Sequence, residues 1–126
     1  MMTAVMVGLI CVAGGVGAAL RFVADSTIRH HVAWTYPVAT FVINFSGSVL
    51  LGLLTGVVAA HTVPHGWQLV VGTGLLGGYT TFSTASFETI RLIGDRRYLS
   101  AAVNGFGMLI ACTAGAGAGY AAGLAL

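Results

Sequence analysis

One apolar stretch of the chain carries a run of glycine and hydroxyl residues, GLLGGYTTFST, at positions 74–84. Adjacent glycines followed by β-branched threonines are weak helix formers, so this run is a candidate interruption of a helix. An interruption frees backbone carbonyl groups, which suit a cation, and N–H and hydroxyl groups, which suit an anion. The run also fits an intact helix, in which Gly74 and Gly78 form a packing face and the threonines bond back to the preceding turn.

A second polar group at an unexpected place is Asn44, in an apolar stretch that also contains Thr40, Ser46 and Ser48. The asparagine amide has two donors and an acceptor with two lone pairs, and an apolar environment satisfies none of them. Asn44 is therefore either a donor that lines a polar pathway or a hydrogen-bonding residue that joins two helices.

The last apolar stretch contains a weaker pattern. Asn104, Met108 and Cys112 are spaced four residues apart, so they share one face of a helix. The second cysteine, Cys11, also lies in an apolar run. We interpret both cysteines as small core residues rather than as a disulfide or a metal site.

The composition indicates what surrounds these polar residues. Hydrophobic residues make up 57% of the 126 positions and charged residues only 6%, against roughly a quarter charged in soluble proteins. Five arginines and three acidic residues could not cover a globule of this size with a solvated surface. The mean hydropathy of +0.95 therefore predicts an integral membrane protein. A net charge of +2 from scattered arginines does not suggest nucleic-acid binding.

Four stretches are long enough to cross a bilayer, which takes about twenty apolar residues. They cover about residues 4–23, 38–60, 67–93 and 98–126. The connections between them are short, so we expect an all-α fold with one transmembrane domain over residues 1–126, a four-helix membrane bundle. The 19 glycines would let the helices approach closely. Four thin helices enclose little volume, so a transport path would need at least a dimer.

The arginines predict an orientation. With four spans, the first and third loops lie on one side of the membrane, and both termini and the second loop lie on the other. All five arginines fall on or near the first side, which the positive-inside rule assigns to the cytoplasm. Both termini are then expected outside. Near the end of the third span, Glu88 and Arg91 are three residues apart and predict an interfacial ion pair. The arginines are Arg21, Arg29, Arg91, Arg96 and Arg97.

The run at 74–84, together with Asn44 and the Leu20-Arg21 pair, resembles the Fluc (CrcB) family of fluoride channels. The likeness extends over nearly the whole chain in length, number of spans and register of the motifs. It implies an antiparallel, dual-topology dimer of four-helix subunits with two fluoride pores. It also implies a central Na⁺ that is structural and is not transported.

The resemblance assigns roles to particular residues. The structural Na⁺ would be held by the backbone carbonyls of Gly77 and Thr80, where the third helix breaks. Arg21 would be a pore-mouth or structural residue. The fluoride pathway would use donors and a phenylalanine ring edge from Asn44, Phe82, Ser83, Thr84 and Asn104.

The chain also departs from the family pattern. Ala85 stands where the family has a second phenylalanine, and Phe87 follows two residues later. A helical step of about 100° per residue places positions 85 and 87 about 200° apart, so Phe87 cannot replace the missing ring. Met108 and Cys112 stand where relatives often carry hydroxyls in the fourth span. Both changes weaken the case for a complete pore built from this subunit alone.

The function that these observations predict is passive, fluoride-selective conduction across a bacterial plasma membrane, which would lower fluoride in the cytoplasm. With neither a nucleotide motif nor a mid-membrane acid, a pump or an enzyme is not expected. One alternative is a small multidrug-type transporter, which relies on a carboxylate in its first span; residues 2–24 contain none. Another is a non-conducting structural or regulatory subunit.

The partner is expected to be an antiparallel second subunit. A dual-topology homodimer requires one sequence to insert both ways, whereas the arginines here favour one orientation. The arginine bias therefore predicts a paralogue of opposite bias, with a second copy of this chain as the alternative.

Overall fold

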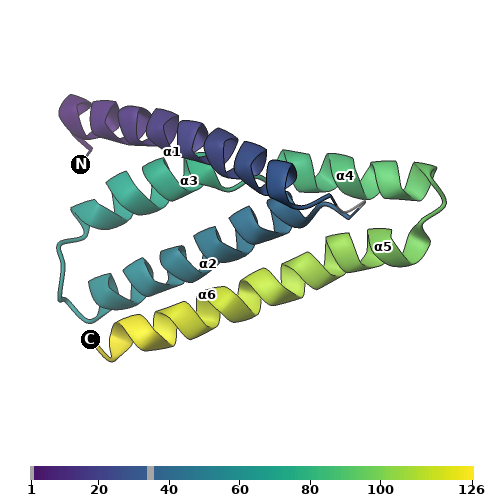
Figure 1. Ribbon diagram of the computed structural model, residues 1–126. Coiled ribbons are helices and arrows are strands. Elements are labelled where there is room, and N and C mark those ends of the chain that lie inside the picture. Colours follow the sequence, from purple (N-terminus) through teal and green to yellow (C-terminus); the bar gives the residue numbers. More distant parts are fainter. Residues whose placement is uncertain (1, 34–35) are drawn as a thin grey trace.

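The computed structural model describes residues 2–33 and 36–126, and these residues form helices joined by short connections (Figure 1). No strand occurs among the described residues, so the all-α prediction is confirmed. Two of the helical segments, η1 and η2, have wider π-helical turns, which the sequence did not predict. In chain order the elements are α1 (Ala4–His31), α2 (Val38–Ala59), η1 (Gln68–Leu76), α3 (Gly77–Tyr79), α4 (Phe82–Gly94), α5 (Tyr98–Ala102), η2 (Val103–Gly107) and α6 (Met108–Leu124).

Among the described residues, three helices are long and apolar enough to cross a membrane by length and composition. They are α1, α2 and the continuous helix Tyr98–Leu124, which is made of α5, η2 and α6. The third apolar stretch is divided, because α3 ends at Tyr79 and α4 begins at Phe82. The expected interruption is thus present, and it lies at Thr80 and Thr81.

The first helix is longer than predicted. We expected it to end near residue 23, but α1 continues to His31. The extra two turns contain neither proline nor glycine, and Asp25 and Arg29 form an i,i+4 ion pair of 2.8 Å across them. Basic residues in the last turn also stabilise the helix through its dipole. The expected loop over 24–37 was therefore wrong for its first eight residues.

Glycine allows the helices to pack backbone against backbone. A Cβ atom at Gly17 of α1 would collide with the carbonyl group of Leu75, and one at Gly119 of α6 would collide with that of Val49 in α2. α1 therefore lies directly on η1 and α3, and α2 lies directly on α6, as Figure 1 shows. The predicted use of small residues for close helix contact is confirmed at these positions.

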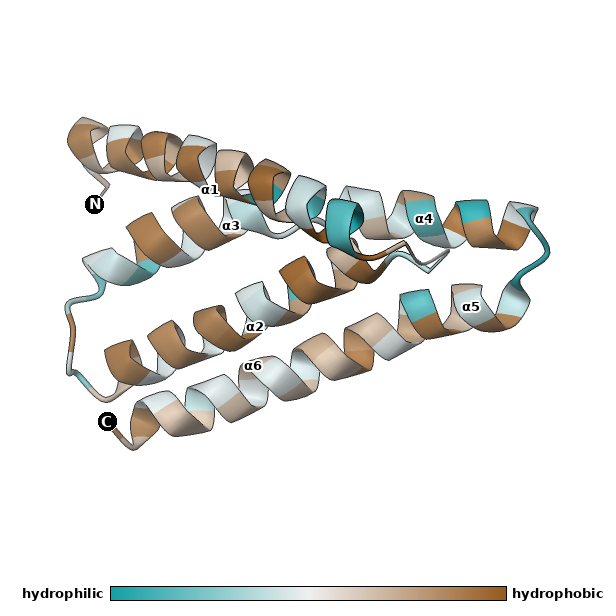
Figure 2. Cartoon of the chain, viewed as in Figure 1, coloured by the Kyte–Doolittle hydropathy of each residue, from teal (hydrophilic) through white to brown (hydrophobic). Residues whose placement is uncertain are grey.

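Little of the apolar surface is buried within the chain. The largest fully buried side chains are Ile43, Asn104 and Thr40, while many large apolar side chains are exposed. Hydrophobic residues cover most of the length of the helices, and hydrophilic ones gather at the end formed by α4 and α5 (Figure 2). The N- and C-termini both lie at the opposite end, on different edges of the bundle (Figure 1). Such an apolar exterior is what a lipid or protein neighbour would cover.

Candidate functional site

The interruption between α3 and α4 is a two-residue extended segment. Thr80 has φ −78° and ψ 162°, and Thr81 has φ −147° and ψ 123°. The Thr80 hydroxyl donates to the carbonyl of Leu76 at 2.9 Å, so it bonds back to the preceding turn. The Thr81 hydroxyl accepts the backbone N–H of Thr84 at 3.2 Å and so caps the start of α4. Both ends of the break are thus stabilised by threonine side chains.

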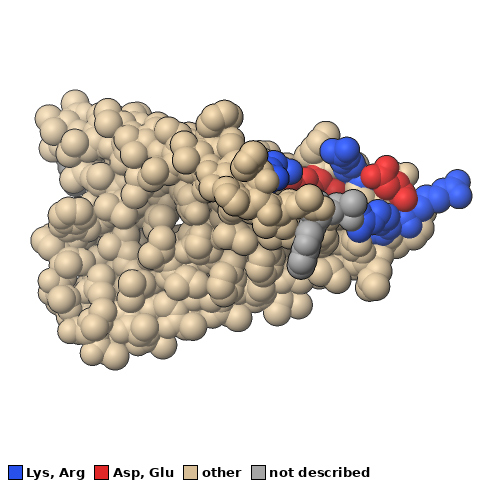
Figure 3. Space-filling model, in the orientation of Figure 1, with Lys and Arg blue, Asp and Glu red and all other residues tan. Residues whose placement is uncertain are grey.

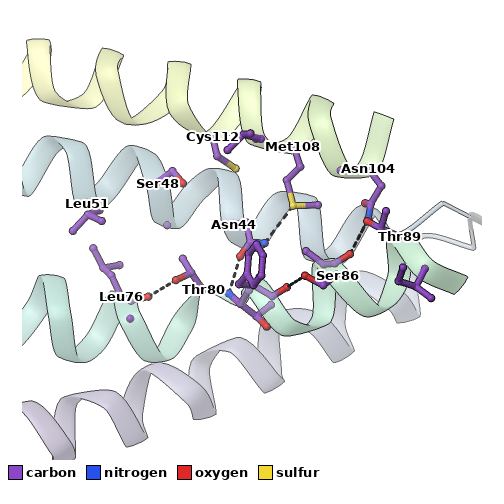
Figure 4. A pocket seen from close by; sticks show the side chains of 18 of the residues that line it. Asn44, Ser48, Leu51, Leu76, Thr80, Ser86, Thr89, Asn104, Met108 and Cys112 are labelled. Atoms are coloured by element: carbon purple, nitrogen blue, oxygen red, sulfur yellow. Dashed lines mark hydrogen bonds between the residues drawn. The ribbon is translucent and has the colours of Figure 1, made fainter. Parts of the chain in front are cut away.

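Asn44 of α2 holds the break in place from the neighbouring helix. Its Nδ2 donates to the carbonyl oxygen of Thr81 at 2.8 Å, and its Oδ1 accepts the Thr81 N–H at 2.8 Å. The side-chain amide thereby satisfies both backbone groups of a residue that has left the helical hydrogen-bond ladder. The second N–H of Asn44 points to the sulfur of Met108, with 3.3 Å between Nδ2 and Sδ (Figure 4). Asn44 therefore joins α2, the break and α6.

The break changes the hydrogen bonding of two backbone carbonyl groups, those of Gly77 and Thr80. In an uninterrupted α-helix the N–H of Thr81 would donate to the carbonyl of Gly77. Here that N–H donates to Asn44, so the Gly77 carbonyl is released from it. The Thr80 carbonyl accepts Nη1 of Arg21 at 2.9 Å. Arg21 is half-buried, so its guanidinium reaches from α1 to the break rather than into solvent.

The hydroxyl groups that follow the break gather around Thr81. The Thr81 hydroxyl donates to Oγ1 of Thr84 at 3.0 Å and lies 3.3 Å from Oγ of Ser83. Phe82, the first residue of α4, is 87% exposed, so its ring projects from the chain. The structure thus brings Asn44, Ser83 and Thr84 to one place around Thr81 and leaves the Phe82 ring largely exposed beside them.

Asn104 connects the last helix to α4. Its Nδ2 donates to Oγ1 of Thr89 at 2.8 Å and to the carbonyl of Ala85 at 3.2 Å. The residue is only 1% exposed, and its Oδ1 is buried with no hydrogen-bond partner in the described part of the chain. Asn104 lies in the π-helical segment η2. Both N–H groups of its side chain are therefore bonded to α4 within the same subunit.

A groove of about 580 Å³ runs between α2, the broken segment and α6 (Figure 4). Asn104, Met108 and Cys112 all line it, which confirms that they share one face. Cys112 is half-buried there, whereas Cys11 is exposed, so the expectation that both cysteines are core residues was wrong for Cys11. The predicted site residues that line the groove are Asn44, Gly77, Thr80, Phe82 and Asn104.

Glu88 has different partners from those that we predicted. Its Oε1 accepts the Thr40 hydroxyl at 2.9 Å and Nη2 of Arg29 at 3.1 Å. The expected ion pair with Arg91 is absent from the described contacts, because α4 turns Glu88 inward while Arg91 is exposed. We did not predict the hydrogen bond between Thr40 and Glu88. The two residues are 48 positions apart, so no local spacing indicates the contact.

Charged side chains gather at one end of the molecule, over the end of α1 and over α4 with the turn that follows it (Figure 3). Burial, and then the negative charge of Glu88, raise the pKa of Tyr36 in this region. The second carboxylate oxygen of Glu88 is buried with no partner in the described part of the chain. This end therefore combines exposed arginines with one partly buried carboxylate.

Comparison with known proteins identifies the family. Residues 8–120 match the family described as CrcB-like protein, Camphor Resistance (CrcB). A protein of Leifsonia xyli subsp. xyli named fluoride-specific ion channel FluC 1 is 42% identical over 126 residues, covering 99% of this chain and 92% of the relative.

Two further relatives carry similar names. Fluoride-specific ion channel FluC 3 of Bifidobacterium longum is 41% identical over 101 residues, which cover 80% of this chain and 84% of the relative. FluC 2 of Cutibacterium acnes is 42% identical over 115 residues, which cover 90% and 94%. These names describe ion channels and not enzymes. The chain therefore belongs to the CrcB-like family, as the motif around its broken helix predicted.

Proposed function

We propose that this chain is a subunit of a passive, fluoride-selective channel in a bacterial plasma membrane, and that the channel lowers fluoride in the cytoplasm. The observation that carries the proposal is the paired hydrogen bonding of Asn44 with Thr81. It holds the broken helix so that donors from α2 and from the start of α4 gather around Thr81, a residue that lines the groove. The names of the relatives support fluoride as the ion.

The groups at this place suit a small, strongly hydrated anion. A selective path must replace the water around fluoride by closely placed donors. Asn44 supplies amide N–H, Ser83 and Thr84 supply hydroxyls, and the edge of the Phe82 ring is electropositive. Asn104 would contribute to the path only if one of its N–H groups left Thr89 or Ala85. Conduction is passive in this proposal, because these groups bind an ion without consuming energy.

The proposed channel crosses the membrane four times per subunit. In this arrangement η1 and α3 together with α4 form the third crossing. The charged end of Figure 3 faces the cytoplasm, in keeping with the positive-inside rule, and both termini lie outside. Arg21 then has a structural role at the break, because its guanidinium is bonded to the Thr80 carbonyl.

The complete channel is an antiparallel dimer in this proposal, and the second subunit is a paralogue of opposite arginine bias. Numbered names among the relatives are in keeping with several such chains. Ala85 and Met108 support a mixed pair, because a different subunit could supply the groups that they lack. If no such paralogue exists, a second copy of this chain is the partner.

Fluoride release from liposomes tests the function. We expect liposomes that contain this chain and its paralogue to release fluoride rapidly to a fluoride electrode and to retain chloride. Liposomes with this chain alone should release little fluoride, and empty liposomes none. If the pair releases neither ion, the chain is a structural or regulatory subunit and the proposed conduction is wrong.

We further propose a structural Na⁺ at the carbonyls of Gly77 and Thr80. The carbonyls fit this role, because the Gly77 group is released from Thr81 and the Thr80 oxygen keeps a second lone pair beside Arg21. Two carbonyls do not surround a cation, so the partner subunit would supply the others. When bound, the ion would neutralise buried carbonyl dipoles at the interface.

Removing Na⁺ tests this site. With a bulky organic cation in place of Na⁺ in every buffer, we expect fluoride release to fall and the dimer to dissociate in detergent. The dimer is measured by size-exclusion chromatography, which does not depend on conduction. If neither flux nor dimer responds to the exchange, no such cation site exists.

A further inference from the structure

The donors of Asn44 are not held equally tightly. One N–H makes a 2.8 Å bond to the Thr81 carbonyl, which is strengthened by the reverse bond from the Thr81 N–H to Oδ1. The other N–H lies 3.3 Å from the sulfur of Met108. A thioether is a weak acceptor, so this second N–H is the one that a better acceptor could take over.

The Met108 side chain lies where such an acceptor would have to bind. The residue is 6% exposed, begins α6 and reaches across the groove toward α2, between Asn104 and Cys112 (Figure 4). Methionine is unbranched and flexible, so its sulfur can move aside without any change in the backbone. The thioether therefore occupies the groove beside Asn44, and it can leave this place without a change in the backbone.

We propose that Met108 is a specificity-determining residue, a displaceable thioether that only a strong hydrogen-bond acceptor can move from Asn44. The proposal rests on the proposed fluoride conduction. Fluoride concentrates its charge on a small atom and accepts a short, charge-assisted hydrogen bond from the Asn44 N–H. Chloride is larger and a weaker acceptor, so it gains less from this N–H and also needs more room than the moved side chain leaves.

The Met108→Ala variant tests the proposal through ion selectivity. The ratio of fluoride to chloride release, measured with liposomes that contain the variant and its paralogue, should fall by about tenfold, because the vacated space lets the larger chloride ion reach the Asn44 N–H that the variant keeps. Chloride release should rise while fluoride release persists. Ile110→Ala is the matched control, since Ile110 is on the same helix, is exposed and does not line the groove. Its selectivity ratio should equal that of the unmodified protein.

A second measurement does not depend on conduction. Cys112 lines the groove one helical turn from Met108, so its reaction with a small anionic thiosulfonate reports how far the thioether limits access to this part of the groove. In a Cys11→Ser background, the Met108→Ala variant should increase the rate of Cys112 modification about tenfold, and Ile110→Ala should not.

The two measurements separate the proposals. If Cys112 becomes more reactive in Met108→Ala but no protein conducts fluoride, the proposed function fails and the obstruction by Met108 stands. If the reactivity of Cys112 is unchanged, Met108 does not obstruct the groove and the inference is overturned. If the protein conducts fluoride and the selectivity ratio is unchanged in Met108→Ala, the assigned role in specificity is also overturned.

Discussion

In liposomes that also contain the paralogue, the Asn44→Ala variant is expected to abolish fluoride release. The substitution removes the N–H donor that faces the groove and both hydrogen bonds to Thr81. The Thr81 N–H and carbonyl would then lie in an apolar environment without partners, at a cost of about 1–3 kcal/mol each. We therefore expect loss of flux together with a measurable loss of thermal stability in detergent. A fluoride electrode and a thermal melt read the two effects separately.

Ser46→Ala is the control for this prediction. Ser46 is on the same helix, and its hydroxyl bonds to the Ile43 carbonyl and the Tyr79 hydroxyl, away from the groove. This variant removes a polar side chain of α2 but leaves the break intact, so fluoride release should persist. Unchanged flux in Asn44→Ala would mean that Asn44 only joins helices and does not line the path.

Nearly every copy of this chain expressed alone is expected to insert with both termini outside the cell. The five arginines all lie on or near the first and third loops, and the second loop has none, which strongly favours one orientation. A chain with one orientation cannot pair antiparallel with itself. Tags on both termini, probed from outside intact cells, measure the orientation, and growth on fluoride measures function. The chain alone should give no resistance.

A variant with a reduced arginine bias provides the control. Replacing Arg96 and Arg97 by glutamine, and His61 and His65 in the second loop by arginine, reduces the bias and should give tags on both faces. If the unmodified chain already shows its tags equally on both faces and alone confers fluoride resistance, it forms an antiparallel homodimer. The paralogue would then be unnecessary.

The positions of the helices could largely be predicted from apolar stretches and breakers. The end of α1 could not, because apolar length says where a span ends and not where a helix ends. Beyond residue 23 the helix is stabilised by the ion pair of Asp25 with Arg29 and by the basic residues of its last turn. The π-helical turns at η1 and η2 also left no recognisable pattern in the residues.

The place of the candidate site could be predicted, but its contacts could not. Weak helix formers marked the interruption, and Asn44 stood out as a polar group in an apolar stretch. Its pairing with Thr81 joins residues 37 positions apart, so it depends on how α2 lies against the break. For the same reason Glu88 pairs with Arg29 across the fold rather than with Arg91 one turn away.

The position of both termini at one end of the molecule limits how such a subunit can be duplicated within one gene. Because both ends lie at the same end of the molecule (Figure 1), two copies joined head to tail by a short linker would point the same way. An antiparallel pair in a single polypeptide would need a linker that itself crosses the bilayer, which takes about twenty apolar residues. An engineered tandem protein should therefore carry one additional membrane helix between its halves.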